Sequence, residues 1–335
     1  MVKMSDVAKL ANVSTATVSR VLRNPEAVKK ITQQKVFEAI KQLDYQPNIL
    51  ARHFRTNQTK TILVVVPSLT NLVFSEMISG IDTVATEKGY QVLLGNTNKE
   101  VEKAQSYINH LKQKQVDGVI LLTVKLAQEL WEEIAHDYPI VLASDFVEDL
   151  DIPAVCIDNI NCGYQITEHL IKLGHQKIAH VSGALDVAIS RERVKGYRKA
   201  LHHYNIPIDE SLMIEADYSI GSGYSSVRKL MKQDNKPTAI FFGNDEMAMG
   251  GIKAAKEMGI RVPEDLAVIG FDDIKFSAVF DPALTTIAQP FHEMGRKSME
   301  LLLKIMNDEP LEHEKYVIES QFIVRESCGA NIKGQ

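Results

Sequence analysis

From residue 61 onward, hydrophobic residues occur in near-continuous runs of strand length, separated by segments with helical periodicity. Runs that are apolar at every position are typical of strands buried on both faces, and their alternation with helices is typical of parallel sheets. The pattern therefore predicts an α/β body of parallel sheets flanked by helices. The runs that we interpret as strands are 61–67, 90–96, 117–123, 139–144, 154–158, 177–183, 238–245 and 266–272.

This body is too long for one hydrophobic core, so we expect its strands to divide between two lobes. We place the first lobe at residues 61–160 with about 291–322, and the second at 161–290 with about 323–331. The C-terminal part contains a helical pattern followed by a strand-like pattern. We expect this tail to pack back on both lobes.

Near the N-terminus the apolar spacing changes to that of short helices. Residues 4–11 predict one helix with Ser5 as its N-cap, and residues 15–22 predict a second helix after a three-residue turn. A third helix is expected to begin at a Thr32 cap. Short helices joined by such a turn indicate a helix-turn-helix domain at residues 1–46.

The distribution of charge separates these two parts of the chain. The 335 residues carry a net charge of −5, but residues 1–60 hold eleven Lys and Arg against four Asp and Glu. That segment is therefore +7, and the rest of the chain is −12. A basic segment ahead of an acidic body indicates a module that binds a polyanion such as nucleic acid. The alternative is a basic face that is merely solvated.

Composition narrows the compartment and the class of function. We see neither a secretory signal nor a run of about 18 apolar residues, so we expect a cytoplasmic protein with no membrane partner. The cysteines, Cys156, Cys162 and Cys328, show no metal-ligand spacing, so we expect reduced thiols and no metal. We find no phosphate loop, nucleophile elbow or zinc motif, so we expect neither an enzyme nor a cofactor.

Several motifs give the chain a more specific resemblance. DVAKLANVSTATVSRVL resembles the helix-turn-helix of the lac-repressor family of bacterial transcription regulators, and YQPNILAR resembles the entry to that family's hinge. FSEMISGID, QKQVDGVILL, NDEMAMGGIKAAKEMGIRVPEDLAVIGFDD and DPALTTIAQPFHEMGRKSMELLL resemble the family's core in order and spacing. The resemblance implies a periplasmic-binding-protein-like body. It also implies a homodimeric repressor that binds double-stranded palindromic operator DNA and is controlled by a small-molecule effector.

By this resemblance, the helix at 15–22 lies in the major groove of one operator half-site. Side chains there present hydrogen bonds or methyl groups to base edges. Arg20 can reach a guanine or a phosphate, whereas Thr17 and Ser19 can instead contact phosphates alone. Ser5 and Asn24 lie near turns, where each can either form a cap or contact the DNA backbone. The DNA-binding residues predicted in this domain are Ser5, Thr15, Ala16, Thr17, Ser19, Arg20 and Asn24.

Residues 47–60 are expected to form a hinge helix and a linker. A helix this short is marginal in water, and in this family it is expected to order only on the operator. Phe54 stands where relatives usually carry a leucine that inserts between base pairs in the minor groove. We therefore predict a phenylalanine wedge, flanked by DNA contacts from Arg52 and Arg55. The alternative is that Phe54 packs against the body at the domain junction.

Ligands of two-lobed folds bind between the lobes, near the carboxyl ends of the strands. That rule gives a predicted effector site of Val73, Phe74, Asp145, Phe146, Arg193, Tyr218, Asn244 and Asp272. The resemblance implies effector contacts for four of them: an aromatic face (Phe74, Tyr218), a guanidinium (Arg193) and a carboxylate (Asp272). This chemistry suits a nucleoside or a sugar with adjacent hydroxyls.

Alternatives stay open for several of these residues. Phe74 can be ordinary core between the lobes, and Asp272 can be a strand-end cap. Val187 and Ile189 stand where purine-sensing relatives carry polar residues, which disfavours a free purine.

Two other functions fit parts of the sequence. A catabolite-control regulator with a phosphorylated carrier protein as corepressor would share the same motifs. A solute-binding protein would share the body fold alone, and it would have a secretory signal and no basic head. The sequence leaves open whether an effector releases the protein from DNA or strengthens its binding.

Overall fold

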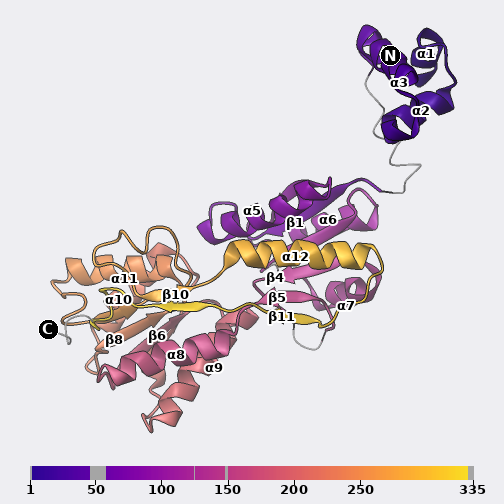
Figure 1. The fold of residues 1–335 in the computed structure, drawn as a ribbon. Helices are drawn as coiled ribbons and strands as arrows, with labels where there is room; N and C mark the ends of the chain where they lie inside the picture. Colours follow the sequence, from indigo (N-terminus) through magenta and orange to yellow (C-terminus); the bar gives the residue numbers. More distant parts are fainter. Residues whose placement is uncertain (1, 46–57, 124, 148–149, 331–335) are drawn as a thin grey trace. The chain divides into compact units, whose positions relative to one another are not determined.

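The computed structural model describes residues 2–45, 58–123, 125–147 and 150–330. The chain divides into two compact units, which we call the head (Met1–Thr59) and the body (Lys60–Gln335). Figure 1 labels most of the helices and several of the strands of both units. The predicted hinge contacts at Arg52, Phe54 and Arg55 lie outside the described residues, so they remain predictions.

The head contains the predicted helix-turn-helix. Its described residues form α1 (Met4–Leu10), α2 (Thr15–Arg23), the 3-10 turn η1 (Pro25–Ala27) and α3 (Lys30–Leu43). Their apolar faces meet in a small core of Val7, Ala8, Ala11, Val18, Val21, Val36, Ala39 and Tyr45.

The caps of the head helices differ from two predictions. Ser14 caps α2, because its Oγ accepts the Thr17 N–H at 3.1 Å. Ser5, however, lies inside α1, where the Asp6 carboxylate accepts the Lys3 N–H at 2.9 Å instead. The α3 helix likewise begins before Thr32, with Lys29 at its N-cap position.

Gln33 explains the early start of α3. Its side-chain amide donates to the carbonyl oxygens of Pro25 and Val28, at 2.7 Å each. These bonds fix the preceding turn against the first turn of the helix. The chain therefore becomes helical at Lys30, before it reaches Thr32.

The body is an α/β unit of two lobes, as predicted. The first lobe contains a parallel sheet in the order β11-β5-β4-β3-β1-β2. Its strands are β1 (Thr61–Val66), β2 (Gln91–Asn96), β3 (Gly118–Leu122), β4 (Ile140–Ala143), β5 (Ala154–Cys156) and β11 (Lys315–Val317). Helices α5 (Leu72–Glu87) and α12 (Phe291–Met306) cover one face, and α6 (Val101–Lys112) and α7 (Gln128–Asp137) cover the other.

The second lobe repeats this arrangement with a parallel sheet in the order β7-β6-β8-β9. Its strands are β6 (Ile178–Ser182), β7 (Met213–Glu215), β8 (Ala239–Phe242) and β9 (Ala267–Ile269). Helices α8 (Asn159–Lys172) and α9 (Ala188–His203) cover one face, and α10 (Ile220–Leu230) and α11 (Asp245–Glu257) cover the other. A short 3-10 turn, η2 (Glu210–Leu212), precedes β7.

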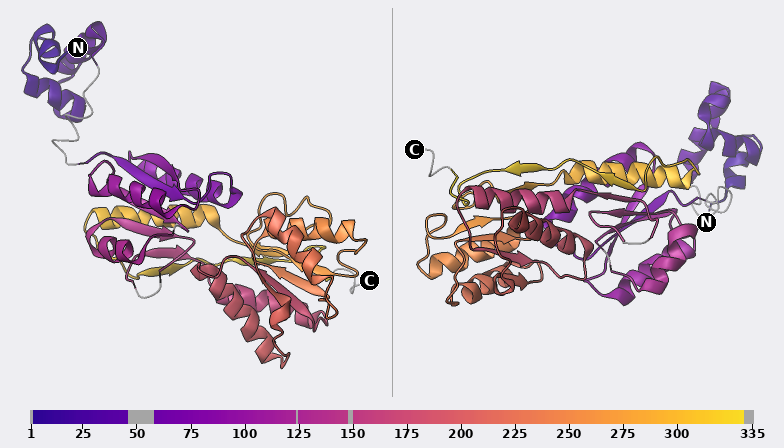
Figure 2. Two further views of the ribbon diagram at one scale, coloured as in Figure 1. Left: turned by 180° about the vertical axis from the view of Figure 1, so that it is seen from behind. Right: turned by 90° about the horizontal axis from the view of Figure 1, so that it is seen from below.

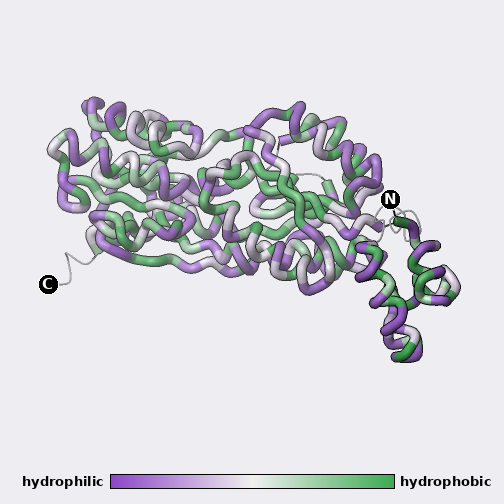
Figure 3. Tube along the Cα trace, turned by 90° about the horizontal axis from the view of Figure 1, so that it is seen from above, coloured by the Kyte–Doolittle hydropathy of each residue, from purple (hydrophilic) through white to green (hydrophobic). Residues whose placement is uncertain are grey.

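The tail connects the lobes, as Figure 2 shows. α12 packs on the first lobe against α5, and β11 then extends that lobe's sheet. The last strand, β12 (Gln321–Ile323), instead pairs with β10 (Thr286–Ala288), which follows the second lobe. Figure 3 shows hydrophobic positions concentrated along the strands inside each lobe of the body, with polar positions recurring on the outer helices.

Glycines allow three helix pairs of the body to pack at close range. The pairs are α5 with α12, α8 with α9, and α10 with α11. In each pair, an added Cβ at a glycine of either helix would lie within about 2.5 Å of backbone atoms of the other helix. These glycines are Gly80 and Gly295, Gly163 and Gly196, and Gly223 and Gly250.

Replacing Gly223 by alanine is expected to destabilise the body by about 1–3 kcal/mol, because overpacking forces the backbone to move. Its added Cβ would lie 2.0 Å from the Met247 carbonyl oxygen. Gly221 lies in the same helix, and there the nearest atom would be 3.9 Å away. Gly221→Ala should therefore be neutral or stabilising by up to about 1 kcal/mol. Urea denaturation of both variants checks this, and equal effects would contradict it.

Candidate functional site

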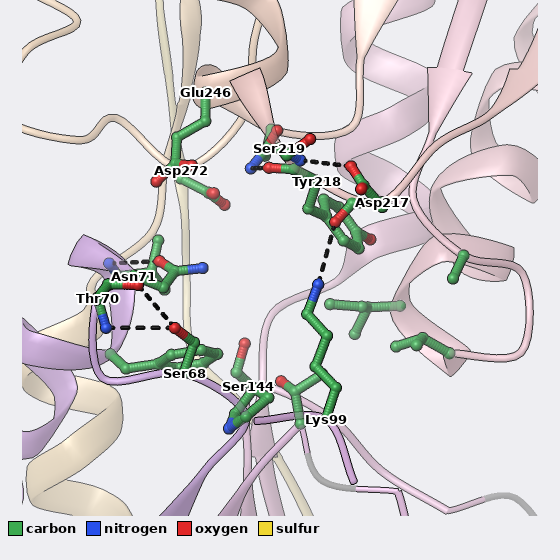
Figure 4. A pocket seen from close by; sticks show the side chains of 18 of the residues that line it. Ser68, Thr70, Asn71, Lys99, Ser144, Asp217, Tyr218, Ser219, Glu246 and Asp272 are labelled. Atoms are coloured by element: carbon green, nitrogen blue, oxygen red, sulfur yellow. Dashed lines mark hydrogen bonds between the residues drawn. The ribbon is translucent and has the colours of Figure 1, made fainter. Parts of the chain in front are cut away.

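A cavity of about 420 Å³ lies between the two lobes of the body. It is lined by residues that follow strands β1 to β4 in the first lobe and β6 to β9 in the second. Figure 4 shows side chains from both lobes pointing into it. This is the position expected for the ligand site of such a fold. The lining comprises Pro67, Ser68, Thr70, Asn71, Val73, Phe74, Thr97, Lys99, Glu100, Thr123, Lys125, Ser144, Ala184, Val187, Ile189, Arg193, Asp217, Tyr218, Ser219, Asn244, Glu246, Asp272 and Gln289.

The backbone around this cavity adopts left-handed conformations at non-glycine residues. Lys99, Thr123, Ser144 and Tyr218 have φ values of 65°, 51°, 66° and 69°, and Asp272 has a φ of 115°. All five lie within three residues of a strand end. Such conformations cost free energy and concentrate at functional sites. Five residues of the lining therefore have a backbone conformation that is uncommon for residues other than glycine.

Asp272 is the most deeply buried carboxylate of the lining, with 8% of its surface exposed. The Gln289 side-chain amide donates to its Oδ1 at 2.7 Å. Burial raises the pKa of Asp272 to about 7, and the nearby Arg193 guanidinium opposes that rise. The carboxylate is thus held in place by the protein while still lining the cavity, as a ligand-binding group requires.

Arg193 is buried beneath the same wall of the cavity, with 3% of its surface exposed. Its Nε donates to Asn159 Oδ1 at 2.9 Å, and another guanidinium nitrogen donates to the Gly243 carbonyl oxygen. The guanidinium carbon lies 3.6 Å from the ring centre of Phe271, a cation–π contact. These contacts fix a positive charge close to Asp272.

Tyr218 and Asn244 hold each other at the second-lobe side of the cavity. The Asn244 amide donates to the Tyr218 carbonyl oxygen at 3.1 Å, and its Oδ1 caps α11 by accepting the Met247 N–H at 3.0 Å. The Tyr218 hydroxyl and Ser190 Oγ lie 2.6 Å apart. Asn244 lines the cavity, but both ends of its amide already have protein partners.

Val73 and Phe74 line the cavity from the first turn of α5. Phe74 is only 7% exposed and belongs to the hydrophobic core, so it serves the core and the cavity wall together. Asn71 fixes this turn by accepting the Val73 N–H at 3.0 Å.

Asp145 and Phe146 do not line the cavity; their neighbour Ser144 does. The left-handed Ser144 turns the chain, so that the Phe146 ring meets the Lys315 ammonium group 3.6 Å from its centre. Asp145 accepts the Phe146 N–H at 2.9 Å, and burial raises its pKa to about 7. The predicted effector contacts of these two residues thus have no place in the cavity.

Sequence reasoning missed most of the polar lining of the first lobe, including two lysines that reach the second lobe. Lys99 donates to the Asp217 carbonyl oxygen at 3.4 Å, as Figure 4 shows, and Lys125 pairs with Asp186. Both lysines follow strand ends, β2 and β3. Applying the strand-end rule to these two strands as well could have found them.

Asp245 lies next to the lining and is completely buried. Its carboxylate accepts from the Ile274 N–H, the Ser277 hydroxyl and the Thr286 hydroxyl, at 2.7–2.9 Å. These bonds hold the segment that follows Asp272. Burial raises the pKa of Asp245 to about 8, and the charge of Asp272 adds to that rise.

The raised pKa of Asp245 makes a prediction about stability. Between about pH 4 and pH 8 the folded state keeps a proton that the unfolded state has released, so folding becomes less favourable as pH rises. Asp245→Asn cannot ionise, so its stability relative to the wild type should rise by at least about 2 kcal/mol from pH 5 to pH 8. Urea denaturation across this range measures the difference. A stability difference between Asp245→Asn and the wild type that stays constant from pH 5 to pH 8 would contradict this prediction. Asp281→Asn is the control, because the Asp281 side chain is exposed.

The head presents a second candidate surface, for nucleic acid. A shallow hollow in it is lined by Met4, Thr15, Ala16, Ser19, Arg20, Asn24 and Ala27. Most of the predicted DNA contacts on α2 therefore share one surface. Ser5 and Thr17 lie outside the hollow, and the Thr17 hydroxyl is 2.9 Å from Ser14 Oγ.

Within the residues that the structure describes, no cluster of His, Cys, Asp and Glu is arranged to hold a metal ion. No helix in the described ranges is long and apolar enough to cross a membrane.

Comparison with known proteins gives matches for both the head and the body. Residues 59–326 match the family described as periplasmic binding proteins and sugar binding domain of LacI family, and residues 3–48 match bacterial regulatory proteins, lacI family. Catabolite control protein A of Priestia megaterium is 40% identical over 93% of this chain and 94% of its own length. The transcriptional repressor CytR of Escherichia coli K12 is 36% identical over 98% of this chain and 96% of its own length.

Solved structures agree with these matches. The lac repressor dimer bound to operator and the anti-inducer ONPF has a TM-score of 0.88 at 30% identity, covering 98% of this chain and 99% of that one. The transcriptional regulator CelR in complex with cellobiose has a TM-score of 0.74 at 31% identity, covering 98% of this chain and all of that one.

Three segments of the sequence predict a finer likeness within the family, to the cytidine repressor. Residues 14–28, 60–82 and 284–290 resemble the cytidine repressor in particular. Over the whole chain, however, identity to catabolite control protein A is at least as high as identity to CytR. The matches to both domain families cover the head and the body, and this chain therefore belongs to the lacI family of bacterial regulatory proteins as a DNA-binding transcriptional repressor.

Proposed function

We propose that this repressor binds a sugar or a nucleoside in the cavity between its lobes, and that the bound effector changes its affinity for operator DNA. The observation that carries the proposal is the wall formed by Asp272 and Arg193, which places a buried carboxylate beside a fixed guanidinium. Adjacent hydroxyls can donate to the first and accept from the second. Phe74 and Tyr218 offer aromatic surface to a ring.

Homodimer formation on a palindromic operator is part of this proposal. Edge strand β2 exposes Leu93 and Leu94, by 52% and 46%, and the second lobe exposes Ile220, Phe276 and Val279, by 47–77%. Large exposed apolar side chains on an unpaired edge favour association with a second copy. Two heads would then read two half-sites, in the cytoplasm, where the operator is accessible.

Control would act through the relative arrangement of the lobes. An effector that prefers one arrangement shifts the population toward it, and the size of the effect equals the difference in binding free energy. The hinge at residues 47–60 would carry this change to the head. Operator affinity measured with and without the effector decides whether the effector releases the protein from DNA or strengthens its binding.

A panel of nucleosides and sugars tests the effector class by thermal stabilisation. A ligand present at about 100 times its Kd stabilises the folded state by about 2.7 kcal/mol, an upward Tm shift of about 5 °C. We expect at least one member to produce such a shift. If none does, the small-molecule effector gives way to a protein corepressor, which the identity to catabolite control protein A supports as the second candidate.

A further inference from the structure

Glu246 is a carboxylate of the cavity wall that the sequence did not single out. It is the second residue of α11, it is half-buried, and it lines the cavity. In the view of Figure 4 its side chain projects from the same side of the cavity as that of Asp272, and its charge acts on Asp272. Burial raises its pKa, with no hydrogen bond or neighbouring base to oppose the rise among the described residues. A donor group is favourable beside a desolvated carboxylate, so Glu246 can accept hydrogen bonds from a ligand in the cavity.

The positively charged side chains that line the cavity already interact with other groups of the protein. Arg193 acts on Asp272 and is bound to Asn159, to the Gly243 carbonyl and to the face of Phe271. The two lysines of the lining belong to the first lobe and hold Asp217 and Asp186. The charge of Glu246 is therefore in excess, and it also raises the pKa of Asp272.

The N-terminus of α11 alone does not account for this arrangement. A helix N-terminus favours a carboxylate in its first turn, and that interaction is satisfied equally by a side chain in solvent. Here the side chain instead lines a cavity together with a second carboxylate, Asp272, on which its charge acts. Two acceptors placed side by side can share the donor groups of one ligand.

We propose that Glu246 determines effector specificity: with Asp272 it forms a wall that selects a hydroxylated effector carrying an amino group and rejects one with a phosphate or carboxylate at that position. An ammonium or amino group donates to both carboxylates, and an ammonium also neutralises the excess charge, whereas an anionic group would be repelled by both. This inference rests on the proposed function, because it specifies the ligand of the same cavity.

Matched ligands test the proposal by calorimetric titration of the full-length protein. The first pair is glucosamine and glucose, and the second is cytidine and uridine, which differ by an amino donor against a carbonyl acceptor. In at least one pair we expect the amino member to bind the wild type about tenfold more tightly. Glucosamine 6-phosphate and glucose 6-phosphate, added to the panel, should bind more weakly than their unphosphorylated forms.

The isosteric Glu246→Gln variant should reduce the amino preference to less than about twofold and change the affinity of the other member little. Glu257→Gln is the matched control, because Glu257 lies at the other end of α11, pairs with Lys253 at 3.0 Å and does not line the cavity. The amino preference should survive in that variant. Melting temperatures without ligand show whether both variants are folded, and Glu246→Asp, which keeps the charge, should retain part of the preference.

The outcomes separate this inference from the proposed function. Binding of either pair with no preference for the amino member, or a preference that Glu246→Gln leaves unchanged, overturns the role of Glu246 and leaves the effector cavity intact. If Glu246→Gln lowers the melting temperature without ligand but leaves the affinity ratio within each pair unchanged, Glu246 only stabilises the N-terminus of α11. That result also overturns its role in specificity. If no member of either pair binds the wild type, this inference is overturned, and the thermal-stabilisation panel decides the proposed effector class separately.

Discussion

Replacing Arg20 by alanine is expected to weaken operator binding by about 10- to 100-fold while leaving ligand binding by the body unchanged. Arg20 is exposed on α2 and lines the hollow that it shares with Thr15, Ala16 and Ser19. A guanidinium that binds a guanine edge contributes about 1–3 kcal/mol of base discrimination. The measurement is fluorescence anisotropy with an operator selected from random double-stranded DNA. Salt must be held fixed, because phosphate contacts make the affinity steeply salt-dependent.

Lys41→Ala provides the control for charge. It also removes one positive charge from the head, but Lys41 lies in the last turn of α3 and does not line the hollow. Its loss should weaken binding by less than about threefold. Equal losses in the two variants would mean that Arg20 acts through charge alone. Operators changed at single bases extend the test, because Arg20→Ala should relax the preference at one position.

Asp272→Asn should lower effector affinity by about 10- to 100-fold and remove the response of the repressor to its effector. Hydrogen bonds to a charged group contribute about 1.5–3 kcal/mol each, and the variant loses the charge while keeping the shape. Asp272 is held by Gln289 and faces the cavity, so little else should change. Calorimetric titration with the stabilising member of the panel measures the loss, and operator affinity without effector should stay within about twofold.

Asp273→Asn is the matched control for this change. It removes the same charge one residue further along the chain, where the carboxylate pairs with Arg325 at 2.7 Å and does not line the cavity. Effector affinity should therefore be retained. An equal loss in both variants would assign the effect to loop structure, and no loss in either would remove Asp272 from the site.

Much of the fold could be predicted from the sequence, because buried parallel strands leave near-continuous apolar runs. Every predicted run contains a strand, but seven of the eight runs continue past the end of that strand. The two longest extensions, each of three residues, contain Asn244 and Asp272, and both of these residues line the cavity. β7 and β10 escaped prediction because they have three residues each and no such run.

The candidate site was predictable in part. Six of the eight predicted effector residues line the cavity, because strand ends of a parallel sheet meet at one edge. The failure at Asp145 and Phe146 depends on the left-handed turn at Ser144, which a serine does not signal in sequence. Glu246 was overlooked because polar residues are common in the first turn of a helix; only its position against Asp272 distinguishes it.

In the proposed mechanism, a ligand in the body cavity controls DNA binding by the head. The most direct test measures operator affinity with and without the panel compound that stabilises the protein most, in the wild type and in Asp272→Asn. A coupling free energy of about 1–3 kcal/mol predicts at least a fivefold change in the wild type, and we expect less than a twofold change in the variant. A compound that binds the wild-type cavity yet leaves operator affinity the same would contradict the claim.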